Sequence, residues 1–205
     1  MMNSLRRLDD EHDCDSKDKK EKGEADKMLG EMLATRTIII AEEVSPELSR
    51  RVLGQLVLLN RRSETEPIRV YINSPGGCAD SGFAIYDMLR FFPAPVITIV
   101  SGLCASAGIV IFLAAEKGKR LSLANSRFML HQPSTGVRGT ASDIEITADE
   151  IIKTRVRYNS LVGECTGKTM EQVTKDCDRD FWMSPEECVA YNLVDRIVVR
   201  SADIG

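Results

Sequence analysis

Histidine is scarce in this chain, and its scarcity limits the chemistry available. His12 and His131 are the only two histidines in 205 residues, so a reaction that needs an imidazole base must use one of them. His12 lies in a densely charged segment, whereas His131 ends an apolar run. A single histidine on an apolar strand is more often a packed core residue than a base, so both interpretations of His131 stay open here.

The sequence also lacks paired cysteines and a strong charge of either sign. Its six cysteines include no C-x-x-C pair, and no His/Cys cluster has zinc-site spacing. The 27 Lys and Arg residues against 31 Asp and Glu residues give a net charge of −4, which indicates neither a nucleic-acid surface nor a polybasic membrane surface. We therefore expect no metal, and reduced thiols that pack in the core of a cytoplasmic protein.

No secretory signal opens the sequence, because the first residues mix both charge signs densely around no apolar centre. Such a segment cannot bury a core, so we expect residues 1–34 to form a solvated, flexible arm. The arm is either an inert tail or a gating or docking element. Residues 35–200 are expected to form one domain, and residues 201–205 a short tail.

Long uncharged runs are absent with one exception, Val96–Ala115. The run begins with β-branched residues and becomes small and glycine-rich around Ser106. We interpret it as a strand that feeds a helix, with Ser106 at the junction, where the free N–H groups and dipole of the helix would face the hydroxyl. A run of this length could also cross a bilayer or form a plain buried strand and helix, but its serines and glycines disfavour a membrane span.

Segments typical of strands and of helices alternate along the chain. Apolar or alternating runs predict strands at residues 37–41, 68–73, 127–131 and 196–199. Helical periodicity or a capping pattern predicts helices that begin near residues 45, 81, 142, 169 and 184. The helix from Ser142 is long, and its S-D-I-E sequence is a capping box. This alternation predicts an α/β fold of parallel βαβ units.

A base at the end of the 127–131 strand could activate Ser106. His131 is followed closely by Pro133, and functional sites of α/β sheets collect at strand ends. The imidazole would take the serine proton, provided that a carboxylate holds its tautomer. Asp178 and Asp180 both precede the last capped helix and are both candidates.

The glycine pair Gly76-Gly77 follows another predicted strand. Such a pair is commonly a tight turn, but it also lets the backbone approach a ligand closely. The N–H groups of Gly77 and of Ala107, the residue after the serine, would then bracket a negatively charged oxygen.

Two further patterns are misleading. The segment C-A-S-A-G lacks the first glycine of a nucleophile elbow because Cys104 occupies that position, so we expect no α/β-hydrolase turn. The segment G-E-C-T-G-K-T follows a predicted helix and is one residue short of a phosphate-binding loop. We therefore expect no ATP site in this chain.

Four segments in this order resemble the proteolytic subunit of the Clp (caseinolytic) protease family: YINSPGG, SGLCASAG, NSRFMLHQP and DRDFWMSPEECVAYNLVD. The resemblance covers about residues 37–199 and implies the Clp/crotonase fold, in which stacked βαβ units carry a protruding handle made of a strand and the long helix. It implies a serine endopeptidase with Ser106 as nucleophile, His131 as general base and Asp180, rather than Asp178, as the residue that orients the imidazole. Gly77 and Ala107 would supply the oxyanion amides.

The resemblance also implies substrate contacts and partners. Gly76, Pro133 and Thr135 would lie beside the bound peptide, and Asp178 and Arg179 near a contact between two stacked seven-membered rings. An ATP-driven Clp-type unfoldase would deliver polypeptides to the enclosed chamber, so the chain itself would bind no cofactor. A mixed ring with a second related subunit is an alternative.

The sequence departs from the family pattern at three places. Ala107 replaces the methionine that commonly follows the nucleophile, Arg69 stands where many members have an aromatic docking residue, and residues 1–34 replace a short axial loop. These differences leave the expected chemistry in place but put the gating and the ATPase partner in doubt. Two other hypotheses remain: a non-catalytic or partner-activated ring subunit, and a crotonase-like acyl-CoA enzyme, against which the Ser/His/Asp set argues.

Overall fold

The computed structural model describes residue 24 and residues 27–204. Most of the expected arm over residues 1–34, including His12, lies outside the described residues, although residues 27–34 are helical. The chain divides into two compact units, residues 1–37 and residues 38–205. The flexible arm and the domain boundaries at residues 35, 200 and 205 stay predictions.

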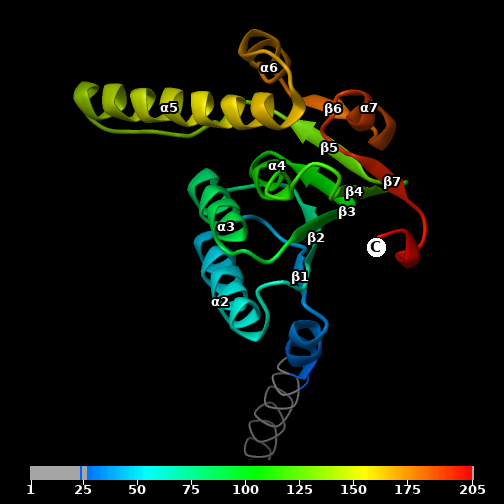
Figure 1. Cartoon of the computed structure of the whole chain (residues 1–205). Helices are drawn as coiled ribbons and strands as arrows, with labels where there is room; N and C mark the ends of the chain where they lie inside the picture. Colours follow the sequence, from blue (N-terminus) through cyan, green and yellow to red (C-terminus); the bar gives the residue numbers. More distant parts are fainter. Residues whose placement is uncertain (1–23, 25–26, 205) are drawn as a thin grey trace, which may run out of the picture. The chain divides into compact units, whose positions relative to one another are not determined.

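A mixed sheet organises the second unit, with the strand order β1-β2-β3-β4-β7, and with β5 beside β3 and β6 beside β5 (Figure 1). Its strands in the described part of the chain are β1 (Thr37–Ile40), β2 (Ile68–Ser74), β3 (Val96–Ala105), β4 (Arg120–Leu123), β5 (Arg127–Leu130), β6 (Phe181–Met183) and β7 (Arg196–Val198). Strand β3 pairs in parallel with β2, β4 and β5, whereas β6 is antiparallel to β5. The α/β class is confirmed, but the sheet is not purely parallel. Strands β4 and β6 were not expected from the sequence.

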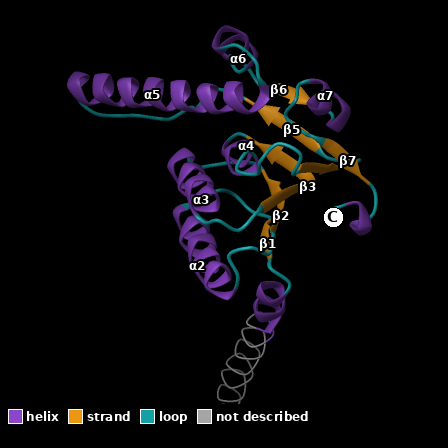
Figure 2. Cartoon of the chain, in the orientation of Figure 1, coloured by secondary structure: helices purple, strands orange, loops and turns teal. Residues whose placement is uncertain are grey.

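The helices described in the second unit are α2 (Pro46–Arg62), α3 (Ala79–Phe91), α4 (Ala107–Phe112), α5 (Ala141–Thr166), α6 (Met170–Asp176), α7 (Pro185–Ala190) and a 3₁₀ turn at Ser201–Asp203. Helices α2, α3 and α4 lie along one face of the sheet (Figure 2). Thr98 of β3 points to that face, because its hydroxyl donates to the carbonyl of Phe112 in α4 at 2.9 Å. Strand alternation therefore turns Ile97 and Ile99 to the other face, where they pack with Leu121 and Val198.

The uncharged run 96–115 is a strand followed by a helix, as expected. Its first half is β3, its second half contains α4, and Ser106 lies between them. No helix within residues 27–204 combines the length and the apolar character that a membrane crossing needs.

The long helix α5 is capped two residues earlier than predicted. Its N-cap is Thr140, whose hydroxyl accepts from the Asp143 N–H at 3.3 Å, while the Asp143 carboxylate accepts from the Thr140 N–H at 3.1 Å. The sequence holds two overlapping capping patterns, and the helix uses the first, so Ser142 lies inside the helix. The segment 131–139 that runs along α5 has no assigned strand, so the handle here consists of a helix and a loop (Figure 1).

Three thiols pack in the core as expected. Cys104, Cys177 and Cys188 are buried, and the described cysteines form no disulfide with one another. Burial raises the pKa of the Cys177 thiol to about 12, so this thiol stays protonated and inert at neutral pH. Cys78 differs, because it is exposed.

A buried ion pair ties β4 to the turn before β7. Arg120 is 2% exposed and donates to both oxygens of Asp195, from Nη2 at 2.9 Å and from Nε at 3.3 Å. Its Nη1 donates to the carbonyl of Cys165 at 3.1 Å. Asp195 in turn accepts from the backbone N–H groups of Gly118 and Arg120. Each nitrogen of the guanidinium and both oxygens of the carboxylate therefore have a hydrogen-bond partner.

We expect Asp195→Ala to destabilise the fold by roughly 3 kcal/mol or more, because it leaves the Arg120 guanidinium buried without a counter-charge. Urea unfolding followed by circular dichroism, at one fixed protein concentration, measures the loss. The control is Glu150→Ala, which removes an exposed ion pair with Lys153 and should not measurably change the midpoint. Equal midpoints for the two variants would contradict the prediction.

Candidate active site

Ser106 sits in a strained turn between β3 and α4. Its φ of 54° and ψ of −122° place a non-glycine residue in the left-handed half of backbone space. The Ser106 N–H donates to the Met129 carbonyl of β5 at 2.9 Å, and the Ser106 carbonyl accepts from the Ile109 N–H at 3.0 Å. The turn at the strand–helix junction was expected, although Cys104 replaces the first glycine of an α/β-hydrolase nucleophile elbow. Hydrogen bonds on both sides of the serine hold the turn without that glycine.

The strand register brings the serine, the histidine and one aspartate together. Parallel pairing places Ala105 of β3 opposite Met129 of β5, so Ser106 lies near the end of β5. Antiparallel pairing places Leu130 opposite Phe181. His131 directly follows β5 and Asp180 directly precedes β6, so these two residues lie beside each other. These three side chains come from segments that are 25 and 49 residues apart in the sequence.

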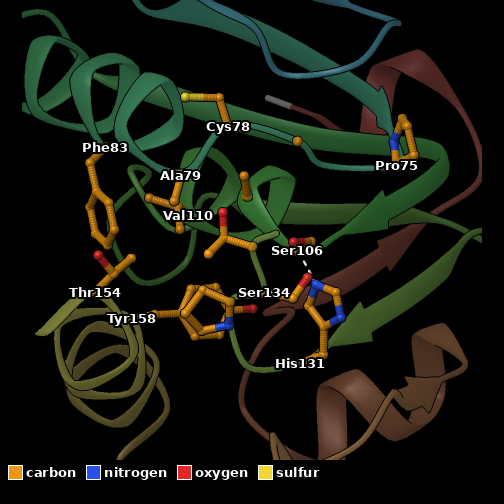
Figure 3. A pocket seen from close by; sticks show the side chains of 14 residues that line it. Pro75, Cys78, Ala79, Phe83, Ser106, Val110, His131, Ser134, Thr154 and Tyr158 are labelled. Atoms are coloured by element: carbon orange, nitrogen blue, oxygen red, sulfur yellow. Dashed lines mark hydrogen bonds between the residues drawn. The ribbon is translucent and has the colours of Figure 1, made fainter. Parts of the chain in front are cut away.

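The three side chains form a continuous hydrogen-bonded series. His131 Nε2 lies 2.7 Å from Ser106 Oγ (Figure 3), and His131 Nδ1 lies 3.2 Å from Asp180 Oδ1. In the tautomer whose Nδ1–H donates to Asp180, Nε2 accepts the serine O–H. This arrangement can withdraw a proton from a serine hydroxyl as the oxygen attacks an electrophile.

Asp178 is turned to a different partner. Its backbone carbonyl accepts from Gln132 Nε2 at 2.9 Å, and its carboxylate is 3.4 Å from the same nitrogen. The two aspartates, which the residues alone left as alternatives, are therefore separated by their contacts: Asp180 meets His131, and Asp178 meets Gln132. Asp178 and its neighbour Arg179 are both exposed.

The loop after β2 is held by the segment before α2. The Val44 N–H donates to the Gly76 carbonyl and the Cys78 N–H donates to the Val44 carbonyl, each at 2.7 Å. Gly77 lies between these bonds, and within the described residues its own N–H donates to no carbonyl; the same holds for the N–H of Ala107. Both residues line the pocket that contains Ser106, so two free backbone donors are available there.

Gly76 packs directly against the serine. A Cβ atom on Gly76 would lie 2.5 Å from Ser106 Cβ and 2.7 Å from the Ala105 carbonyl oxygen, distances that real Cβ atoms do not adopt. Its φ of +93° is a second reason for glycine at this position. Gly76 thus lets the loop after β2 approach the strained turn, but Gly76 itself does not line the pocket.

A pocket of about 440 Å³ opens beside Ser106 (Figure 3). Its lining includes Pro133 and Thr135, which were expected beside a peptide. It also includes side chains that sequence reasoning missed, from the N-cap of α3 and from α3, α4 and α5: Cys78, Ala79, Phe83, Val110, Thr154 and Tyr158. In the sequence these residues carry only the helical periodicity of core positions, which does not point to Ser106. Among the described residues, no three His, Cys, Asp or Glu side chains gather as a metal site would need.

Comparisons with known proteins agree on one family. The Clp protease family model matches residues 19–201. The ATP-dependent Clp protease proteolytic subunit 2 of Treponema denticola is 48% identical over 87% of this chain and 90% of its own length. The proteolytic subunit 3 of Rhizobium etli is 49% identical over 84% of this chain and 89% of its own. A solved ClpP1 mutant from Listeria monocytogenes superimposes with a TM-score of 0.81 at 42% identity, covering 87% of this chain and 99% of that structure.

We expect Gly76→Ala to displace the turn at Ser106 and to lower the rate of Ser106 labelling by a fluorophosphonate at least about tenfold, because a misplaced nucleophile loses its alignment. Intact mass spectrometry over time measures this rate. Gly118→Ala is the matched control, since its φ of +92° is almost the same but nothing lies within 4 Å of the added Cβ. Equal slowing in both variants would show that contact with Ser106 is not the cause.

Proposed function

Since this chain belongs to the Clp protease family, whose members are peptidases, we propose that it is a serine endopeptidase subunit that cleaves unfolded polypeptides to short peptides. The observation that carries the proposal is the 2.7 Å contact between His131 Nε2 and Ser106 Oγ, with Asp180 on the far nitrogen of the same ring. Serine, imidazole and carboxylate in this order are the parts of a Ser-His-Asp triad.

In the proposed reaction, Ser106 Oγ attacks the carbonyl carbon of the scissile bond while His131 Nε2 takes its proton. The imidazolium, stabilised by Asp180, then gives this proton to the leaving amine, so the C–N bond breaks and an acyl-serine remains. Water then attacks the acyl carbon while His131 takes its proton; the bond between that carbon and Ser106 Oγ breaks, His131 returns the proton to Oγ, and the peptide leaves with a new carboxyl group. Each proton that leaves an oxygen therefore returns to an amine or to Ser106.

The negatively charged oxygen of each tetrahedral intermediate needs donors that are already in place. The unpaired N–H groups of Gly77 and Ala107 are the proposed donors, because both residues line the pocket at Ser106. Loss of one such donor typically costs about 3 kcal/mol in the barrier. Substituting the side chain of Ala107 leaves its N–H in place, so the family's usual methionine is not needed for this role.

The proposed assembly is two stacked seven-membered rings that enclose the active sites, with Asp178 and Arg179 near the inter-ring contact. Both residues are exposed in the single chain, as this role requires. A Clp-type ATPase would unfold and deliver substrates, in keeping with relatives whose names include "ATP-dependent". The chain would then hold no cofactor of its own, and the free thiols of the described residues suit the reducing cytoplasm.

We expect Ser106→Ala to lower the rate of hydrolysis of a fluorogenic peptide by at least about a thousandfold, because no other group supplies the nucleophile. A fluorophosphonate should label Ser106 in the unmodified protein. Ser201→Ala, in the exposed C-terminal turn, is the control and should retain full activity. Labelling of a different serine, or unimpaired hydrolysis by Ser106→Ala, would refute the proposed function.

We expect the purified 22.8 kDa chain to form a particle of fourteen copies, measured by native mass spectrometry. A smaller particle that reaches this size and becomes active only after a second Clp-type subunit is added would favour the mixed ring. The relatives are named as subunits 2 and 3, which motivates this second arm of the experiment.

A further inference from the structure

The hydroxyl of Tyr158 has no hydrogen-bond partner although its residue is only 5% exposed. Asn60 and Asn159 also have a buried unpaired oxygen among the described residues, but of the three only Tyr158 lines the pocket at Ser106. Its side chain reaches the pocket from α5, opposite the α3 and α4 walls (Figure 3). A buried polar atom without a partner destabilises the empty site, so a ligand that supplies the partner is favoured there.

The Tyr158 hydroxyl is poised as a donor. Burial raises its pKa well above the ordinary value of about 10, so the group is protonated at neutral pH. It therefore offers a proton to an acceptor oxygen on a ligand. Its neighbour one turn earlier, Thr154, is already occupied, because its hydroxyl donates to the Glu150 carbonyl at 2.9 Å.

The rest of the lining limits what can carry that acceptor. Phe83, Val110 and Ala79 form an apolar wall, and no lining residue has a charged side chain apart from His131 when it is protonated. A carboxylate or ammonium group in this pocket would lose water without gaining a counter-charge. A neutral side chain with an apolar stem and a terminal carbonyl oxygen fits both the wall and the hydroxyl, and glutamine has this form.

We infer that Tyr158 is a specificity-determining residue whose hydroxyl donates a hydrogen bond to the side-chain carbonyl of a glutamine at the substrate position that supplies the scissile carbonyl. This substrate position is chosen because its side chain is the one attached nearest to the carbon that Ser106 attacks. The inference rests on the proposed function, since it concerns which peptide bonds are cleaved.

Two fluorogenic peptides test the inference on the full-length protein. They are identical except that the residue before the cleaved bond is glutamine in one and its near-isostere methionine in the other. Tyr158→Phe removes only the hydroxyl, so the ratio of kcat/KM for the glutamine peptide to that for the methionine peptide should fall about tenfold. The fall should come from the glutamine peptide, while cleavage of the methionine peptide is unchanged or faster.

Tyr191→Phe is the matched control. It removes a hydroxyl that donates to Asp176 at 2.8 Å, outside the pocket, and should leave the ratio of the two peptides unchanged. An unchanged ratio in Tyr158→Phe, with both peptides still cleaved, would overturn the inference and leave the proposed function standing. Failure of a fluorophosphonate to label Ser106 in the unmodified protein would instead overturn the proposed function, and the inference with it.

Discussion

The strained backbone at Ser106 is the constraint on which the site depends. A serine with φ of 54° is stable only where its surroundings leave no alternative, and here the bond to Met129 and the start of α4 fix it on both sides. The backbone turn at Ser106 also limits which residue types can lie next to it. Gly76 must lack a Cβ for the loop after β2 to reach the serine, and this approach brings Gly77 and its free N–H into the same pocket.

The buried polar groups of this molecule include two kinds: those whose hydrogen bonds are made within the fold, and one left without a partner at the pocket. Arg120 is buried and Asp195 nearly so, but hydrogen bonds reach each guanidinium nitrogen and both carboxylate oxygens, so the pair supports the fold and needs no ligand. Tyr158 is buried to a similar degree, and its hydroxyl is left unpaired at the wall of the pocket. Hydrogen bonds and the counter-charge offset the cost of desolvation in the first pair, whereas the Tyr158 hydroxyl has no such compensation and is left ready to bind an acceptor.

Local patterns predicted the elements well wherever the signal lay within a few residues. Ser45, Thr169 and Ser184 cap their helices as expected, and the uncharged run splits into strand and helix around Ser106. The predicted cap of α5 was wrong by two residues because two capping patterns overlap, and the helix uses Thr140 with Asp143 rather than Ser142. Strand β6 was missed, because its F-W-M sequence is apolar without alternation and its antiparallel pairing with β5 does not follow from a βαβ pattern.

By itself the sequence determined the α/β class, the junction at Ser106 and the choice of His131, because these follow from local periodicity and from a shortage of histidine. It left Asp178 and Asp180 as equals, and only the resemblance to a family separated them. Tertiary structure decided that Asp180 meets His131, since the antiparallel register of β5 and β6 sets which residue lies opposite. It alone placed Tyr158 of α5 in the wall of the pocket at Ser106, because the meeting of two residues 52 positions apart in one pocket leaves no mark on the pattern of either segment.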